Sequence, residues 1–244
     1  MSNLKKFSAK FGGITMKTIG LLGGMSWEST VTYYQILNRE ALRRLGGVAS
    51  AKIVMVSVDF AEIEALQRAG DWTAIATLLG NAAKNLAGAG ADFLVICTNT
   101  MHKVADAVTK ASGLPLLHIC DCTAEKIRTA GIGRVALLGT AYTMEEPFYL
   151  DRLAAKGLHV TVPDAAERAE IQRIIFTELV CGKILPASRE NCRRIIARLV
   201  AAGAEGVILG CTELPFLIPP EDSPVPLFDT TQIHAMAAAD LALS

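Results

Sequence analysis

The chain has 244 residues, of which 51% are hydrophobic and 20% are charged, and its 24 Lys and Arg side chains balance 24 Asp and Glu. A chain of this length and apolar content can bury the core of one large domain or two medium ones. Its formal net charge of zero provides no general field that would attract nucleic acid or an anionic membrane, so we expect a small molecule as its partner.

Targeting signals and cysteine usage give a second set of expectations. No apolar run approaches the ~20 residues of a membrane span, and residues 1–15 lack the ~7–15-residue apolar stretch of a secretory signal. We therefore expect a soluble, cytoplasmic protein in which residues 1–15 are a dispensable leader. The six cysteines include no Cys-x-x-Cys pair, which favours reduced thiols over disulfides.

Short apolar runs alternate with longer helical patterns along the chain. The predicted strands are 17–23, 52–58, 92–97, 114–119, 134–139, 158–162, 206–210 and 226–229. The predicted helices are 26–44, one from about 61, 71–88, 101–111, 123–130, 143–155, 165–181, 187–202 and one from about 231. This alternation is typical of an α/β fold with parallel sheets flanked by helices.

The sequence also contains an internal repeat. Residues 90–100 and 203–213 align without a gap, so that Thr98 matches Cys211. Two further pairs follow in the same order, namely 19–26 with 135–142, and 114–118 with 225–229. Matched pairs in one order predict two pseudo-symmetric lobes. Ligands of parallel sheets bind outside the carboxyl ends of the strands, so we expect the active site in the cleft between these lobes.

Cys211 is the first predicted catalytic residue. It follows the strand 206–210, after Gly210, which leaves room for another backbone or a ligand, and before the polar Thr212. A thiol has a pKa of about 8.5, and nearby N–H groups or cations lower it, so Cys211 is expected to act as a base near neutral pH. The alternative is a buried structural cysteine, a pattern that Cys97 shows inside its apolar run.

Thr98 is the second predicted catalytic residue, acting as a proton donor because a hydroxyl is a poor base. The alternative is that Thr98 only caps the following helix. Asn99 and Thr100 have the same two interpretations; in the functional one they bind a ligand carboxylate together with helix N–H groups. Thr140 and Thr212, at strand ends of the second copy, are further predicted substrate ligands, and the amides of the turn 23–26 could hold the same anion.

A metal site is a weaker alternative. His118, Cys120 and Cys122 would share one face only if the strand at 114–119 continued past them. The residues from Thr123 onward have instead the pattern of a helix start, so we expect no metal.

Three motifs carry a resemblance to a known family. Residues 20–25, 99–102 and 210–213 resemble the signature stretches of the aspartate/glutamate racemase superfamily, and His102 and Glu213 resemble its aspartate racemase branch. The resemblance implies a cytoplasmic amino-acid racemase, usually a homodimer, that uses neither pyridoxal phosphate nor a metal. In the family, two thiols exchange the α-proton on opposite faces of the substrate.

The resemblance also implies domains and further site residues. Lobe 1 would comprise 16–113 with 225–244, and lobe 2 would comprise 114–224. Met25 and Gln67 would line the pocket.

The chain departs from the family at Thr98, which occupies the position of the first catalytic cysteine. It thus looks like an atypical Thr/Cys subgroup specific for L-aspartate and L-glutamate. A side-chain carboxylate needs a cation, and Arg68 or Arg168 could supply it, although either could be only a solvated helix charge.

Two other functions remain open at this stage. Arylmalonate decarboxylases resemble the same superfamily and use a single cysteine to protonate an enolate, although their pockets are more apolar. A non-catalytic amino-acid-binding protein would retain the cleft without the proton chemistry.

Overall fold

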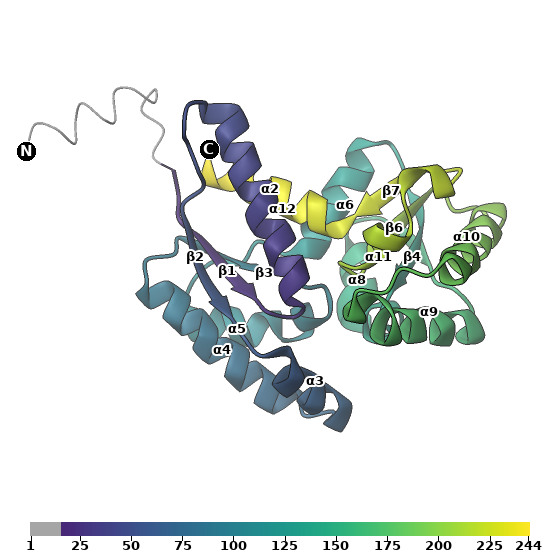
Figure 1. Cartoon of the computed structure of the whole chain (residues 1–244), viewed down its shortest axis with the longest axis horizontal. Coiled ribbons are helices and arrows are strands. Elements are labelled where there is room, and N and C mark those ends of the chain that lie inside the picture. Colours follow the sequence, from purple (N-terminus) through teal and green to yellow (C-terminus); the bar gives the residue numbers. More distant parts are fainter. Residues whose placement is uncertain (1–15) are drawn as a thin grey trace, which may run out of the picture. The chain divides into compact units, whose positions relative to one another are not determined.

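The computed structural model describes residues 16–244, so the expected leader lies outside the described residues. The chain forms two compact units, each with its own parallel sheet (Figure 1). The first unit contains the described residues up to Cys97, together with Val104–Leu117 and His234–Ser244. The second contains Thr98–Lys103 and His118–Ile233. The α/β fold with two helix-flanked parallel sheets is as predicted.

The sheet of the first unit has the order β2-β1-β3. Its strands are β1 (Ile19–Gly23), β2 (Ile53–Ser57) and β3 (Phe93–Ile96). β1 pairs in parallel with both neighbours, and a parallel bridge between Leu94 and Leu116 continues the sheet beyond β3. β1 and β3 are completely buried, which explains their continuous apolar sequence, whereas the edge strand β2 is partly exposed.

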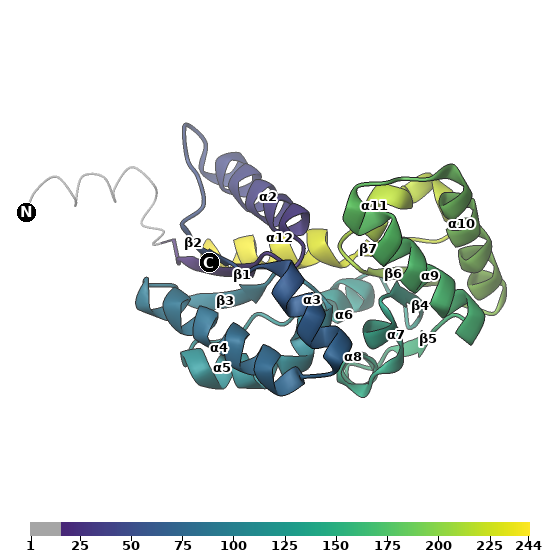
Figure 2. The ribbon, with the colours of Figure 1, turned by 60° about the horizontal axis from the view of Figure 1, so that its bottom comes forward.

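Helices cover both faces of this sheet. They are α2 (Trp27–Leu45), α3 (Phe60–Ala69), α4 (Trp72–Gly88), α5 (Ala105–Ser112) and the end of α12 (Thr230–Ala242). Figure 2 shows α2 and α12 on one face and α4 and α5 on the other. Ser26, Asp59 and Asp71 accept backbone N–H groups at the starts of α2, α3 and α4, as N-cap residues do.

The sheet of the second unit has the order β5-β4-β6-β7. Its strands are β4 (Arg134–Gly139), β5 (His159–Thr161), β6 (Gly206–Gly210) and β7 (Leu227–Asp229), all parallel. β4, β5 and β6 repeat the order of β1, β2 and β3, and β7 corresponds to the bridge at Leu116. The internal repeat of the sequence is therefore a repeat of topology.

The helices of the second unit surround an apolar core that contains the central strands β4 and β6. They are α6 (Ile119–Thr129), α7 (Ala141–Glu145), α8 (Pro147–Ala155), α9 (Ala165–Thr177), α10 (Pro186–Ala201) and α11 (Leu214–Leu217). Short 3₁₀ turns lie at η2 (Thr100–Val104), η3 (Leu179–Cys181) and η4 (Pro220–Asp222).

Three expectations about elements differ from the structure. The expected strand 114–119 is reduced to the bridge at Leu116, because His118 caps α6 by accepting the Cys120 N–H at 3.2 Å. The expected helix 143–155 is divided, because Pro147 starts α8 and has no N–H with which to continue α7. The expected helix at 101 begins as the turn η2, and α5 follows it.

The boundaries of the units also differ from the expected division. β7 pairs with β6, so it belongs to the second sheet. Of the segment 225–244, which was expected in lobe 1, only the residues from His234 onward belong to the first unit. Within residues 16–244, no helix is long and apolar enough to cross a membrane. In the same part of the chain, no three His, Cys, Asp or Glu side chains are grouped as a metal site requires.

Candidate functional site

Three polar residues follow three adjacent strands of the second unit. Thr140 follows β4, Cys211 follows β6 and Thr230 follows β7. Gly139 pairs with Gly210, and Leu209 pairs with Asp229, so the strands end in register. This edge is the position at which open α/β sheets bind ligands.

Cys211 is buried beside a carboxylate. Its Sγ donates to Glu213 Oε2 at 3.0 Å, and Thr212 Oγ1 donates to the same oxygen at 2.8 Å. Burial, and then the negative charge of Glu213, raise the pKa of the Cys211 thiol well above its usual value. The expectation of a lowered pKa was therefore wrong. The adjacent carboxylate instead provides an acceptor for the thiol proton.

Gly210 has a packing role. A Cβ at this position would lie 2.8 Å from Leu137 Cδ1 and 3.1 Å from the Leu138 carbonyl oxygen. The space beside Gly210 is thus filled by β4, and the expected room for a ligand is absent there. Cys97 is completely buried, and burial alone raises its pKa far above the usual range, as expected for a structural thiol.

A chain of hydrogen bonds holds the Asn99 amide. Thr230 Oγ1 donates to the Leu209 carbonyl at 2.8 Å and accepts from Asn99 Nδ2 at 3.0 Å. On the other side, the Tyr149 hydroxyl donates to Asn99 Oδ1 at 2.8 Å. Asn99 thus joins η2, α8 and the start of α12 within the second unit.

Thr100 and Thr140 form a second polar group. Their hydroxyl oxygens are 3.0 Å apart, and Thr140 Oγ1 is 3.1 Å from Thr143 Oγ1. Thr140 also caps α7, since its Oγ1 accepts the Thr143 N–H. The Ala141 N–H donates to Gln172 Oε1 at 2.8 Å, so this amide of the second turn is already paired.

Thr98 is held through its backbone by a neutral histidine. His102 Nδ1 donates to the Thr98 carbonyl oxygen at 2.8 Å, and His102 Nε2 accepts the Ile119 N–H at 3.3 Å. A ring that donates at one nitrogen and accepts at the other is the neutral tautomer. Thr98 belongs to the same compact unit as Cys211, although it follows a strand of the first sheet.

Met25 and Gln67 are both buried residues of the first unit. The turn before Met25 is specialised for packing: Gly24 has a φ of +96°, and a Cβ there would lie 2.2 Å from the Val58 carbonyl oxygen. The Gly24 N–H donates to Thr30 Oγ1 at 2.9 Å, so this amide, which was expected to face an anion, is already used.

The two candidate cations are paired with acidic side chains. Arg68 is exposed and forms a salt bridge with Glu64 one turn earlier on α3. Arg168 donates to Glu145 at 2.7 Å and to the Pro163 carbonyl at 2.7 Å. Such pairing is typical of surface helix charges.

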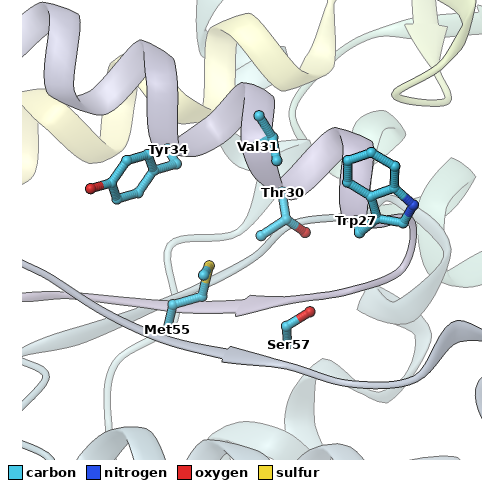
Figure 3. A pocket seen from close by; sticks show the side chains of 6 residues that line it. All are labelled: Trp27, Thr30, Val31, Tyr34, Met55 and Ser57. Carbon is cyan, nitrogen blue, oxygen red and sulfur yellow. The ribbon is translucent and has the colours of Figure 1, made fainter.

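An apolar cavity of about 230 Å³ lies on the surface of the first unit, between α2 and β2 (Figure 3). It is lined by Trp27, Thr30, Val31, Tyr34, Met55 and Ser57. None of these is a predicted site residue, so the cavity and the chemistry are separate features.

Comparison with known protein families shows to which family the chain belongs. The family model described as Asp/Glu/hydantoin racemase matches residues 22–238. The chain belongs to the Asp/Glu/hydantoin racemase family. The racemases of this family are isomerases, and the predicted resemblance to aspartate/glutamate racemases is confirmed.

Solved structures of the family are similar over nearly the whole chain. A Yersinia pestis protein described as a candidate Asp/Glu racemase is 54% identical, with a TM-score of 0.89, covering 94% of this chain and 100% of that one. An aspartate racemase homologue from Pyrococcus horikoshii is 38% identical, with a TM-score of 0.81, covering 94% and 100%. The aspartate racemase of Picrophilus torridus is 22% identical, with a TM-score of 0.70 and coverage of 93% and 94%, and shows the shared fold.

Sequence reasoning missed three residues of this family member's candidate site, Glu213, Tyr149 and Thr230. Glu213 had a signal in its position two residues after Cys211. Thr230 had a usable signal, because it follows the predicted strand 226–229 as Cys211 follows 206–210. Tyr149 had none, since it reaches Asn99 across 50 positions of sequence.

Proposed function

We propose that this protein is a cofactor-independent racemase of L-aspartate or L-glutamate, with Thr98 and Cys211 as its two proton-transfer groups. The observation that carries the proposal is the buried pair of Cys211 and Glu213, in which a thiol at a strand end donates to a carboxylate at 3.0 Å. The family's reaction requires a thiolate, and Glu213 is the group that takes the thiol proton.

The proton steps follow from this pair. The Cys211 proton moves to Glu213, and the thiolate removes the α-proton on one face of the amino acid. The resulting carbanion carries extra charge on its carboxylate, and preorganised donors that meet such charge typically contribute a few kcal/mol each. Thr98 then supplies a proton on the opposite face and recovers one from solvent. Cys211 keeps the α-proton, and Glu213 releases the former thiol proton to solvent, which restores the starting state.

The proposed substrate contacts are amide and hydroxyl groups. Asn99, Thr100 and Thr140 are buried residues of the second unit, and their amide and hydroxyl groups are proposed to donate to the α-carboxylate. The Thr212 hydroxyl donates to Glu213 and therefore also keeps that carboxylate in place. Met25 and Gln67 are proposed as further substrate contacts. We further propose the atypical Thr/Cys subgroup and a cytoplasmic homodimer.

The test is α-proton exchange in deuterated water with a panel of L- and D-amino acids, read by NMR. We expect deuterium at Cα of aspartate or glutamate, with inversion and no loss of CO₂. Binding without exchange would contradict catalysis, and CO₂ release from a malonate-type substrate would indicate the single-cysteine decarboxylase reaction instead. Activity should persist after dialysis against a chelator and after hydroxylamine; restoration by a metal or by pyridoxal phosphate would contradict the mechanism.

A further inference from the structure

Asn99 is held in one orientation by a hydrogen-bond chain whose direction is fixed at its end. The Leu209 carbonyl can only accept, so the single hydroxyl proton of Thr230 points to it. The Thr230 oxygen must then accept, and only the Nδ2 side of the Asn99 amide can donate. Oδ1 therefore faces the opposite way, toward a donor.

Tyr149 is that donor. It is completely buried on α8, and its hydroxyl lies 2.8 Å from Asn99 Oδ1. Burial, and then the neighbouring Cys120, raise the pKa of the Tyr149 phenol well above its usual value, so it keeps its proton at neutral pH. Tyr149 lies in the first turn of α8, just after Pro147, so the helix break between α7 and α8 sets its position.

We propose that Tyr149 is a positioning residue for the reaction: it holds the Asn99 amide so that Nδ2, not Oδ1, is presented to the substrate carboxylate. The inference rests on the proposed function, because it takes Asn99 as a ligand of the α-carboxylate. Nδ2 carries two N–H bonds. Thr230 receives one, and we assign the other to the substrate carboxylate.

The alternative orientation of the amide is costly only while both anchors are present. A flipped Asn99 would direct Nδ2 at the Tyr149 hydroxyl and force the Thr230 proton away from Leu209. Without the Tyr149 hydroxyl, Oδ1 is left buried and unpaired in the active orientation, and the preference for that orientation falls. In the molecules with a flipped amide, the substrate carboxylate would face Asn99 Oδ1, which cannot donate a hydrogen bond.

The kinetic test is a double-mutant cycle between Tyr149→Phe and Asn99→Ala, measured as α-proton exchange. We expect Tyr149→Phe to lower kcat/KM by about 3- to 10-fold in the parent, but by less than about 2-fold when Asn99 is already Ala. Equal losses in both backgrounds would overturn the proposal, because Tyr149 would then act independently of Asn99.

Tyr33→Phe is the matched control. Tyr33 is equally buried, and its hydroxyl donates to His234 Nδ1 at 2.8 Å, but both residues belong to the first unit. Removing this hydroxyl should affect stability without changing kcat/KM. If Tyr33→Phe lowered kcat/KM as much as Tyr149→Phe, the effect would reflect general loosening and the proposal would fail.

A spectroscopic test separates this proposal from the proposed function. In ¹⁵N-labelled protein, the Asn99 side-chain amide signals are identified by their loss in Asn99→Asp. We expect Tyr149→Phe to shift them and speed their exchange with water, while Tyr33→Phe leaves them unchanged. Unchanged signals in Tyr149→Phe would overturn the proposal; if that variant does not fold, Tyr149→Met, which also lacks the hydroxyl, replaces it. A parent that exchanges no α-proton would refute the racemase function, and the amide signals would still decide the role of Tyr149.

Discussion

The two copies of the internal repeat end in the same place but in different chemistry. Thr98 and Cys211 align, and the residues two positions later are Thr100 and Glu213. In the second copy, that residue accepts the thiol proton at 3.0 Å, whereas in the first it lies 3.0 Å from the Thr140 hydroxyl. The end of β6 thus carries a thiol beside a carboxylate that can accept its proton. Thr98 and Thr100, which follow β3, carry hydroxyl groups, and the hydrogen-bond partner of the Thr100 hydroxyl is another hydroxyl.

Equivalent positions in a duplicated fold therefore need not have equivalent roles. The repeat sets where a side chain stands, but the neighbouring side chain sets whether it can give or take a proton. The proposed racemase is therefore expected to be asymmetric, with thiolate chemistry on the Cys211 side.

The largest effect should come from removing the thiol. Cys211→Ala should lower α-proton exchange by about 10³-fold or more, since general acid–base groups typically contribute about 10²- to 10⁴-fold. Far-UV circular dichroism should show an intact fold. Cys97→Ala is the control, because that thiol is buried in the core of the first unit; near-normal exchange in Cys211→Ala would refute its role.

A smaller effect is expected from replacing the base. Glu213→Gln keeps the size of the side chain but cannot take the thiol proton, so exchange at pH 7 should fall by about 10²-fold. The rate of the variant should rise as the pH rises, because solvent must now take the proton, while the parent rate stays flat. A flat profile in the variant would contradict this role.

The alcohol side should show a more selective effect. Thr98→Ala should suppress inversion by about 10-fold or more while sparing wash-out of the α-proton on the Cys211 face. Thr98→Cys should raise activity toward the D-enantiomer more than toward the L-enantiomer. Deuterium incorporation from each enantiomer separately measures both effects, and unchanged inversion in Thr98→Ala would make Thr98 only a structural residue.

The smallest effect on turnover is expected from a buried histidine of the first unit. Burial lowers the pKa of His234 from 6.5 to about 4. The unfolded chain therefore binds more protons between these values, and stability should fall as the pH drops from about 6.5 to 4, by about 3 kcal/mol in all. The free energy of unfolding, measured with urea across this range, should depend more steeply on pH in the parent than in His234→Gln. Equal slopes would contradict the lowered pKa of His234. Exchange at pH 8 should hardly change.

The fold could be predicted well because its central strands are almost entirely buried. Such strands are continuous apolar runs, and β4 and β6 have the predicted bounds, 134–139 and 206–210. The segment around Leu116 was less predictable, since it forms one bridge rather than a strand. The break at Pro147 was visible in the sequence, because proline favours the first turn of a new helix.

Only those candidate site residues that lie at or just after the end of a predicted strand could be identified from the sequence. That rule selects Thr98, Thr140 and Cys211. It gives no information about partners that are distant in sequence, such as Tyr149. It also missed the direction of the Cys211 pKa shift, because the burial of the thiol and the position of Glu213 beside it both depend on the folded backbone.

The thiols differ in accessibility, and this affects chemical labelling. Cys181 is exposed at the end of a 3₁₀ turn, whereas Cys211 and Cys97 are buried. An alkylating reagent should therefore modify Cys181 first, and the first equivalent incorporated should leave turnover intact. Cys122 is half-buried and should react next, so in a background in which Cys181 and Cys122 are both Ser, the next label detected by mass spectrometry should coincide with inactivation, and bound substrate should delay it. The order of labelling thus distinguishes a thiol without a role in catalysis from the catalytic thiol.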